Sequence, residues 1–390
     1  MKAAVYLHAT KQGAIRRGHP WVFPKAIARQ TGTLTTGSLV DVLNADGEHL
    51  GVGVYNEHSL YRVRVLAYAF ESINTASLVD IVKKRLEQAL QLRNQINLPN
   101  TVTNAYRLFN SEGDGLSGLT IDRFNQTCVV SSTAYWLEEN RVLILACLKA
   151  ILPGDRIIWL EQVKALAQDG WQSAAKQEIS GTEQVQELGI IYEVDFSNTQ
   201  KTGLFLDQRE NHQRVANLSA GKRVLDLYTY TGGFALHAAK AGASIVTAVD
   251  SSAQAIELAQ RNAQLNKLDC IEFIEADARE YLAKAGDYDL VILDPPKLVP
   301  SQRHLERAKN YYRFLHRETF KYMKSGSLLM TCNCSSALSA QEFTELVSMQ
   351  AIAAGKMVRI LGVFGPASCH PTLAAFPEGH YLTAVLLAIV

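Results

Sequence analysis

The second half of the chain alternates regularly between short apolar runs rich in β-branched residues and longer stretches with helical spacing. This alternation begins at Lys222 and continues for more than a hundred residues. It predicts a parallel sheet whose strands are joined by crossover helices, so the fold class is α/β. Sheets of this kind bind their ligands at the carboxyl ends of the strands. The predicted strands are Arg223–Leu227, Ser244–Val249, Ile271–Ile274, Tyr288–Leu293 and Ser327–Thr331.

Four of these predicted strands end in acidic residues. Asp226 lies near the end of the first strand, Asp250 follows the second, Asp277 the third and Asp294 the fourth. A single aspartate after a strand is often only the N-cap of the next helix. Four at one edge, with a Gly-Gly pair after the first strand, make capping alone a poor explanation. We therefore expect a ligand site along this edge, with Asp250 placed to accept hydrogen bonds from ribose hydroxyls.

A nicotinamide cofactor is disfavoured. The turn after the first strand lacks the G-x-G-x-x-G spacing that seats a pyrophosphate on a helix N-terminus. That spacing does occur at Gly113–Gly118, between two strand-like runs. Because it opens no predicted helix there, we interpret it as a turn and the match as accidental.

The N-terminal region predicts a small β-barrel-like domain over residues 1–72. Met1–Val40 contains no Asp or Glu, yet it carries several Lys and Arg residues together with Trp21 and Phe23. Short β-rich runs separated by turn residues follow this basic segment. These runs are Ser38–Leu43, Leu50–Tyr55 and Leu60–Leu66.

A mixed α+β domain is expected over residues 73–190, and the parallel sheet over residues 191–390. Helical spacing covers Thr75–Leu98 and Leu137–Ile151. Strand-like runs lie between and after these stretches. They are Ala105–Asn110, Leu119–Val130, Ile157–Leu160 and Ile190–Phe196.

Bulk properties set further limits. With 390 residues, the chain exceeds the ~250–300 residues at which a single core stops growing. A net charge of +1 excludes a strongly basic body, and six cysteines without a regular framework indicate reduced thiols. The longest uncharged apolar stretch, Tyr381–Val390, is about half of what a membrane helix needs. We expect a soluble, cytoplasmic protein.

Motifs along nearly the whole chain match one known family. The most specific is Thr199–Gly203 followed by Asp207-Gln208-Arg209; Asp294-Pro295-Pro296-Lys297 and Asn333-Cys334-Ser335 come later. With these motifs the chain resembles the bacterial 23S ribosomal RNA 5-methylcytosine methyltransferases. The resemblance implies an N-terminal PUA β-barrel that binds RNA and a central α+β domain. It also implies a C-terminal class I, Rossmann-like domain with a mostly parallel seven-stranded sheet. Gly18–Phe23, Arg107-Leu108, Glu112–Leu116 and Ile121–Arg123 extend it into the first half.

The resemblance implies carbon methylation through a covalent adduct. C5 of cytosine is a poor nucleophile, and a thiolate added at C6 makes it enamine-like and able to attack a sulfonium methyl group. Cys334 stands where the family has this nucleophile, and Asp294 would hold the polar edge of the base. Many RNA 5-methylcytosine enzymes use a second cysteine to release the product. Here Pro296 is followed by Lys297, so a single-cysteine mechanism is implied.

The implied cofactor is S-adenosyl-L-methionine and the implied partner is 23S ribosomal RNA; no metal is expected, and a homodimer is left open. RNA contacts are expected from Arg16, Arg17 and Trp21 in the acid-free segment, and from Lys297 and Arg313 after the fourth strand. The cofactor-binding residues are expected to be Arg209, Asp226, Tyr228, Thr229, Tyr230, Gly232, Gly233, Asp250, Ser251, Asp277, Ala278 and Asp294.

Several alternatives stay open. Cys332 is two residues from Cys334 and shares its strand face, while Cys128, Cys147, Cys270 and Cys369 are interpreted as buried thiols. A zinc site of Cys332, Cys334, Cys369 and His370 is disfavoured, because C-x-C lacks the usual C-x₂₋₄-C spacing. Asp-Pro-Pro keeps methylation of a base nitrogen as the second hypothesis. A non-catalytic RNA-binding factor that docks on ribosomes is the third.

Overall fold

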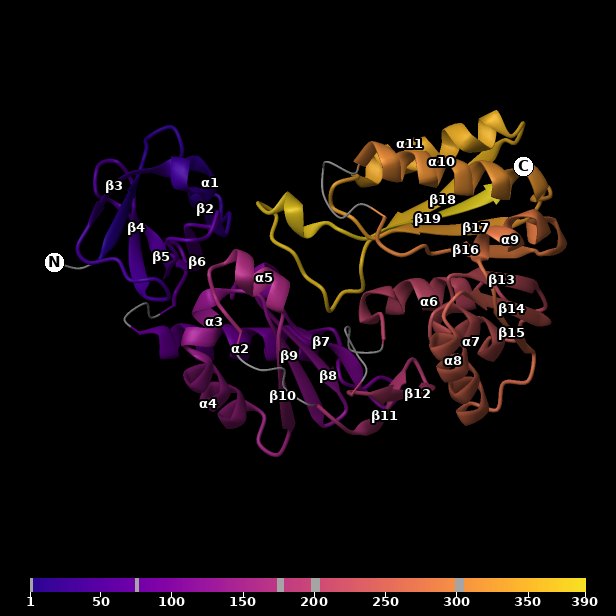
Figure 1. Ribbon diagram of the computed structural model, residues 1–390, viewed down its shortest axis with the longest axis horizontal. Helices are drawn as coiled ribbons and strands as arrows, with labels where there is room; N and C mark the ends of the chain where they lie inside the picture. The colour runs from indigo at the N-terminus through magenta and orange to yellow at the C-terminus, as the bar shows by residue number, and fades with distance from the viewer. Residues whose placement is uncertain (1–2, 74–76, 174–178, 198–203, 299–304) are drawn as a thin grey trace. The chain divides into compact units, whose positions relative to one another are not determined.

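The computed structural model describes residues 3–73, 77–173, 179–197, 204–298 and 305–390. The chain forms two compact units, one of Met1–Ser180 with Cys369–Gly379 and one of Gly181–Ser368 with His380–Val390 (Figure 1). The motif Thr199–Gly203 lies outside the described residues. Among the helices that are described, none is both long and apolar enough to cross a membrane.

The first unit begins with a sheet of six described strands in the order β2-β6-β5-β4-β1-β3. The runs predicted in this region correspond to β4 (Leu39–Leu43), β5 (His49–Tyr55) and β6 (Val63–Tyr68). β6 begins later than expected, because the side chains of Asn56 and Ser59 accept the backbone N–H groups of His58 and Tyr61 and fold this stretch into turns. The acid-free segment also contains β1 (Ala4–Leu7), α1 (Gly13–Arg16), β2 (Trp21–Val22) and β3 (Ile27–Thr31).

A second sheet in this unit joins β10, β9, β8 and β7 in that order. Two sequence-based predictions were wrong here. The run Leu119–Val130 is not one strand but a hairpin, because Asn125 adopts a left-handed φ of 53° and turns the chain. The helix expected over Leu137–Ile151 is two helices that meet at Asn140. The elements are α2 (Leu78–Gln95), β7 (Ala105–Asn110), η2 (Ser111–Asp114), β8 (Leu119–Phe124), β9 (Thr127–Ser132), α3 (Tyr135–Glu139), α4 (Arg141–Ile151), β10 (Arg156–Glu161) and α5 (Val163–Gln168).

The turn interpretation of Gly113–Gly118 is confirmed. These residues lie between β7 and β8, where Gly115 and Gly118 have φ values of 89° and 93°, and they open no α-helix. A left-handed backbone of this kind favours glycine because a side chain would be strained. The glycines therefore serve a tight connection between β7 and β8.

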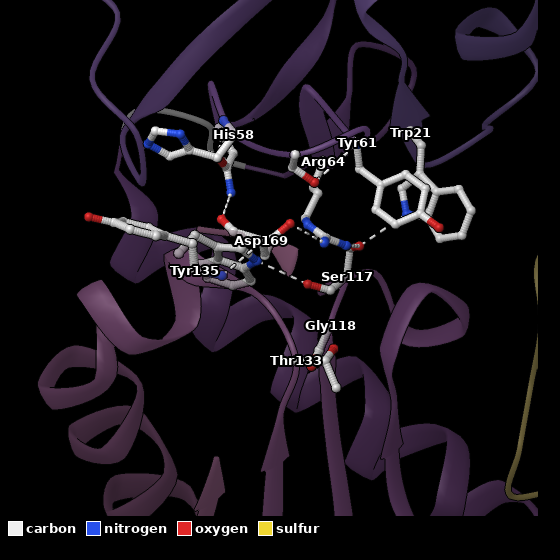
Figure 2. Close-up of polar contacts among 12 residues, drawn as sticks. Trp21, His58, Tyr61, Arg64, Ser117, Gly118, Thr133, Tyr135 and Asp169 are labelled. Atoms are coloured by element: carbon white, nitrogen blue, oxygen red, sulfur yellow. Dashed lines mark hydrogen bonds and ion pairs between the residues drawn. The ribbon is translucent and has the colours of Figure 1, made fainter. Parts of the chain in front are cut away.

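A buried ion pair connects β6 of the first sheet to the end of α5, as Figure 2 shows for Arg64 and Asp169. The Arg64 guanidinium donates to Asp169 Oδ1 at 3.0 Å and to Ser117 Oγ at 2.9 Å. Asp169 Oδ2 also accepts the backbone N–H of Tyr135 at 2.8 Å. Because both charged groups are buried, this pairing is what makes their desolvation tolerable.

The second unit holds the predicted parallel sheet, and the α/β fold class is confirmed. Its described strands lie in the order β15-β14-β13-β16-β17-β19-β18, with β13 to β17 parallel and β19 antiparallel to both neighbours. The strands are β13 (Arg223–Leu227), β14 (Ile245–Asp250), β15 (Ile271–Glu275), β16 (Leu290–Leu293), β17 (Leu328–Asn333), β18 (Val358–Phe364) and β19 (Thr383–Ile389).

Side chains of the sheet alternate between two apolar layers, as expected for strands buried on both faces. Leu225, Leu293 and Leu329 pack in one layer with α10 and α11, while Val224, Ile292 and Met330 pack in the other with α6 and α7. Figure 1 shows these helix pairs on opposite sides of the sheet. The helices are α6 (Arg209–Ala216), α7 (Gly233–Lys240), α8 (Ala253–Leu265), α9 (Ala278–Tyr281), α10 (Leu305–Tyr322) and α11 (Ala340–Ala353).

A hairpin of β11 (Thr182–Glu187) and β12 (Ile190–Asp195) precedes the sheet in the second unit. Two side chains of α8 hold it. The amide oxygens of Asn262 and Asn266 accept the backbone N–H groups of Glu193 and Ile191 at 3.0 and 2.8 Å. The hairpin is therefore anchored to the helical layer that covers one face of the sheet.

Candidate active site

The turn after β13 has an unusual backbone. Tyr228 and Tyr230 adopt φ values of 67° and 51°, and Gly232 adopts 90° as the N-cap of α7. Left-handed non-glycine residues are uncommon and often mark sites where the surrounding structure holds the chain for a ligand. We call residues 228–233 the first-strand loop.

Asp226, near the end of β13, holds this loop through hydrogen bonds. Its side chain is fully buried, and its Oδ2 accepts the Thr229 hydroxyl at 2.6 Å and the Ala235 N–H at 3.1 Å. Oδ1 has no hydrogen-bond partner among the described residues. Burial raises the pKa of this carboxyl to about 6. An unsatisfied buried carboxylate oxygen is suited to receive a donor from a ligand.

Asp250, at the end of β14, fixes the other side of the loop. Its Oδ2 accepts the Tyr230 N–H and its Oδ1 accepts the Ser252 N–H, each at 2.9 Å. Ser251 is exposed at the same edge. Asp250 is therefore partly occupied as a turn-forming residue, and it stands where the loop meets α8.

Asp277 follows β15 and caps α9. It accepts the Arg279 N–H at 2.9 Å and pairs with the Arg279 guanidinium. That side-chain hydrogen bond lowers the pKa of Asp277. Ala278, next in the chain, is 2% exposed.

Asp294 follows β16 and is held by a side chain from another segment. Gln208 lies in a single 3-10 turn just before α6, and its Nε2 donates to Asp294 Oδ2 at 3.0 Å. Burial raises the pKa of Asp294 to about 7, and the negative charges of Asp207 and Asp226 act in the same direction. This carboxyl can therefore exist protonated near neutral pH and act as a hydrogen-bond donor.

The two candidate thiols differ in environment. β16 and β17 are parallel neighbours with Leu293 opposite Thr331, so Asp294 and Cys334 leave adjacent strands at the same edge. Cys332 lies within β17, is fully buried, and has a pKa raised well above its ordinary value, mainly by burial. Cys334 lies directly after the strand and is only partly buried.

The residues around Cys334 include Tyr312, which the sequence analysis did not single out, and Asn333 of the Asn333-Cys334-Ser335 motif. The Tyr312 hydroxyl donates to Asn333 Oδ1 at 3.2 Å, and the Asn333 amide donates to the carbonyls of Ser335 and Leu338. These bonds define the backbone path on both sides of Cys334. Tyr312 lies in the middle of α10, so no local sequence pattern distinguishes it from a core residue.

Other predicted residues are placed as follows. Arg209 begins α6, is 4% exposed and lies 3.7 Å from the Glu210 carboxylate. Lys297 and Arg313 are exposed, and Arg313 donates to Asn310 at 2.6 Å. In the first unit, Arg16 pairs with Glu48 and Arg17 is exposed.

Trp21 is partly buried in an aromatic cluster. Its ring stacks on Tyr61 with a centroid distance of 4.0 Å, and its indole N–H is 3.2 and 3.1 Å from acceptors on Glu112 and Ser117. Phe23, beside it, is 42% exposed. Trp21 therefore has a structural role in the first unit, and its expected contact with RNA stays a prediction.

Family models match both parts of the chain. A model described as S-adenosylmethionine-dependent methyltransferase matches residues 150–360, more than half of the chain. A PUA-like domain model matches residues 5–68. The class of protein is thus a methyltransferase that uses S-adenosylmethionine, with a PUA-like domain at its N-terminal end.

Relatives of similar length narrow this class. A protein of Alteromonas mediterranea named Ribosomal RNA large subunit methyltransferase I is 34% identical over 399 residues, covering 100% of this chain and 99% of that protein. The protein of the same name from Escherichia coli is 32% identical and covers 98% of both chains. The chain belongs to the ribosomal RNA large subunit methyltransferase I family.

Solved structures share the fold. A SAM-dependent methyltransferase from Streptococcus mutans superposes with a TM-score of 0.81 at 22% identity, covering 100% of both chains. A methyltransferase solved in complex with SAH gives a TM-score of 0.83 at 21% identity, again over 100% of both chains. At these identities the likeness concerns the fold.

Proposed function

We propose that this methyltransferase acts on large-subunit ribosomal RNA and methylates C5 of a cytosine in 23S RNA. Its relatives are named as methyltransferases of that RNA, and a PUA-like domain precedes the catalytic domain. The observation that carries the proposal is that Asp294 and Cys334 follow adjacent parallel strands, β16 and β17, at the same edge of the sheet. A carboxyl and an accessible thiol are the two groups that addition to C6 of a pyrimidine requires.

The cofactor would lie on the first-strand loop. Asp226 Oδ1 supports this placement because it is a buried acceptor without a partner, and S-adenosylmethionine carries a cationic amino group and ribose hydroxyls that can donate to such oxygens. Bound there, the cofactor supplies an electrophilic methyl group. The residues proposed to hold it are Arg209, Tyr228, Thr229, Tyr230, Gly232, Gly233, Asp250, Ser251, Asp277 and Ala278, together with Asp226 and Asp294.

Cys334 is proposed as the nucleophile. Its thiolate forms a bond to C6, which moves an electron pair toward N3 of the ring and raises the nucleophilicity of C5. Once C5 carries the methyl group, a base takes the C5 proton. The C5–H electron pair then forms the C5–C6 double bond again, and the S–C6 bond breaks to return the Cys334 thiolate. Cys332 is less suited to this role because it is fully buried and its raised pKa disfavours the thiolate.

Asp294 is proposed to form a hydrogen bond with the polar edge of the cytosine. Because its pKa is about 7, the protonated carboxyl can donate to N3 while negative charge develops there. The Gln208 amide donates to the second oxygen of the carboxyl, Asp294 Oδ2. The carboxyl is thereby oriented before the base arrives.

RNA contacts outside the pocket are proposed for Arg16, Arg17, Trp21, Lys297 and Arg313. Arg17 and Lys297 are exposed cations and can approach phosphates directly. Arg16 and Arg313 already interact with Glu48 and Asn310. These two would have to exchange their present partners for phosphate.

The test is a methylation assay on large-subunit RNA, both as naked transcript and as ribosomal subunits, followed by mass analysis of the released nucleosides. We expect 5-methylcytosine with the parent chain and none with Cys334→Ala. A methyl group on an exocyclic nitrogen would contradict the proposed carbon chemistry. Binding of RNA without any methyl transfer would favour the docking factor.

A further inference from the structure

Three buried titratable side chains of the second unit meet outside the proposed chemistry. Glu187 ends β11, His212 lies on α6 and His237 lies on α7; their exposed fractions are 2%, 5% and 4%. Glu187 Oε1 lies 2.7 Å from His212 Nδ1 and 3.3 Å from His237 Nε2. The two imidazole rings stack with a centroid distance of 5.2 Å. One carboxylate from the hairpin thus connects two helices of the methyltransferase domain.

His212 also packs directly against the first-strand loop. A Cβ built on Gly233 would lie 2.7 Å from His212 Nε2, which is closer than real Cβ atoms approach any neighbour. The imidazole also meets the Phe234 ring edge-on, at 4.6 Å and 88°. The backbone of the loop therefore rests on the ring of His212. The three atoms nearest to that Cβ all belong to the His212 ring.

The charges around the cluster favour a charged Glu187. Burial by itself raises the pKa of Glu187, but His212 and His237 outweigh it and lower the value to about 2. Burial lowers the pKa of His237, and Lys240 and His212 act in the same direction. The charge of His212 also lowers the pKa values of Asp226 and Asp294, against the larger effect of burial. His212 therefore interacts electrostatically both with Glu187 and with the carboxylates of the strand edge.

We propose that His212 is a positioning residue for cofactor binding: held by Glu187, its ring supports Gly233 and fixes the shape of the first-strand loop. No sequence motif marks the hairpin β11–β12 as functional. Through Glu187, this hairpin then stabilises the cofactor site. This inference rests on the proposed placement of the cofactor on that loop. It adds a residue that never touches the reacting atoms.

The test compares His212 with His237, because both are buried, both lie near Glu187, and His212 supplies the side-chain atoms nearest to Gly233. The dissociation constants of SAM and SAH are measured by calorimetry, together with KM, kcat and the unfolding temperature. For His212→Leu we expect the dissociation constant and KM to rise by about tenfold or more, with kcat reduced by less than about threefold. For His237→Leu we expect a lower unfolding temperature and a dissociation constant within about twofold of the parent.

A conservative variant and a steric pair keep the test decisive even if His212→Leu folds poorly. His212→Gln keeps a donor for Glu187 but loses the ring, so we expect affinity between those of the parent and His212→Leu. Gly233→Ala should weaken SAM binding by about tenfold or more, because its Cβ meets the imidazole. Gly233 has an ordinary φ, so an alanine there is strained only by its contact with the imidazole. Removing the imidazole should relieve that contact, and His212→Ala combined with Gly233→Ala should bind SAM more tightly than Gly233→Ala alone.

Three results would overturn the assignment. The first is equal loss of affinity in His212→Leu and His237→Leu, which would make the cluster a general element of stability. The second is unchanged affinity in folded His212 variants. The third is a stoichiometric metal ion found in the purified parent chain, since all three side chains carry donor atoms that metals accept. Failure of the parent chain itself to bind SAM would instead refute the proposed cofactor site.

Discussion

Ionisable side chains that are shielded from water have different partners in the two units. In the first unit, the fully buried Arg93 donates to both oxygens of Asp114 at 2.6 and 2.8 Å, and the buried Arg64 donates to Asp169 Oδ1 at 3.0 Å. At the strand edge of the second unit, the fully buried Asp226 and the partly buried Asp294 have hydroxyl, amide or backbone donors but no Arg or Lys partner among the described residues. Their pKa values are raised to about 6 and about 7, chiefly by burial.

The difference separates structural charges from functional ones. A buried ion pair with all its hydrogen bonds made has no capacity left for a ligand, and breaking it mainly destabilises the fold. A buried carboxyl without a counter-ion destabilises the free protein, yet it can bind a donor or hold a proton near neutral pH. We therefore expect substitutions in the first unit to affect folding, and substitutions at the strand edge to affect chemistry.

The largest effect is expected at the strand edge itself. Cys334→Ala removes the proposed nucleophile from a partly buried position, so methylation should fall by about 10⁴-fold or more while the unfolding temperature changes little. Cys332→Ala is the matched control, since it removes a thiol from the same strand face. Activity close to that of the parent in Cys334→Ala, with loss in Cys332→Ala, would transfer the nucleophile to Cys332.

The opposite outcome is expected for a buried pair of the first unit. Arg93→Met leaves Asp114 buried without its guanidinium, and the free energy of unfolding should drop by about 3–5 kcal/mol. The affinity of the folded protein for SAM should stay unchanged. Urea unfolding measures the free energy of unfolding, and calorimetry measures the affinity for SAM. If Arg93→Met bound SAM more weakly at unchanged stability, the distinction between structural charges in the first unit and functional charges in the second would be wrong.

Asp294→Asn should separate activity from stability. The amide cannot transfer a proton to the base, so the rate should fall by about 10²- to 10³-fold in single-turnover assays. Because Asp294 is also among the residues proposed to hold the cofactor, the dissociation constant of SAM is measured separately and the rate is compared at saturating SAM. A rate within about threefold of the parent would show that the carboxyl has no proton to give, and it would remove Asp294 from the proposed chemistry.

The smallest effect is a change in stability with pH. The pKa of Asp294 is raised from 3.8 in its ordinary state to about 7 in the folded chain, so its protonated form is favoured by folding and this contribution is lost as pH rises through 7. Asp294→Asn has no carboxyl to titrate, so its stability does not fall with pH for this reason. Relative to the parent, the variant should gain about 1–3 kcal/mol of unfolding free energy between pH 5 and pH 8. A constant difference across this range would mean that the carboxyl is not perturbed.

The strand edge was predictable because parallel strands produce continuous apolar runs with recognisable ends. β13 was predicted with its observed bounds, and Gly242 follows α7 with a φ of 88°, as expected for the residue after a helix C-terminus. The acidic residue at each strand end could be read in the same way. The first-strand loop followed from its glycines.

Contacts between distant segments could not be predicted. Gln208 reaches Asp294 across 86 positions of sequence, and Glu187, His212 and His237 follow one another at intervals of 25 positions. No periodic pattern joins such residues, because their proximity depends on how the hairpin and two helices pack. The short strands β1 to β3 were missed for a related reason: β3, with the burial pattern of an edge, has little apolar alternation to read.

The central claim is tested most directly by trapping the covalent step. Large-subunit RNA containing 5-fluorocytosine is incubated with the chain and SAM; fluorine cannot leave as a proton does, so an adduct formed at C6 persists after methyl transfer. Tandem mass spectrometry of the digested complex should locate the base on Cys334. An adduct on Cys332, or no adduct while methylation proceeds on a ring nitrogen or exocyclic amine, would contradict the account.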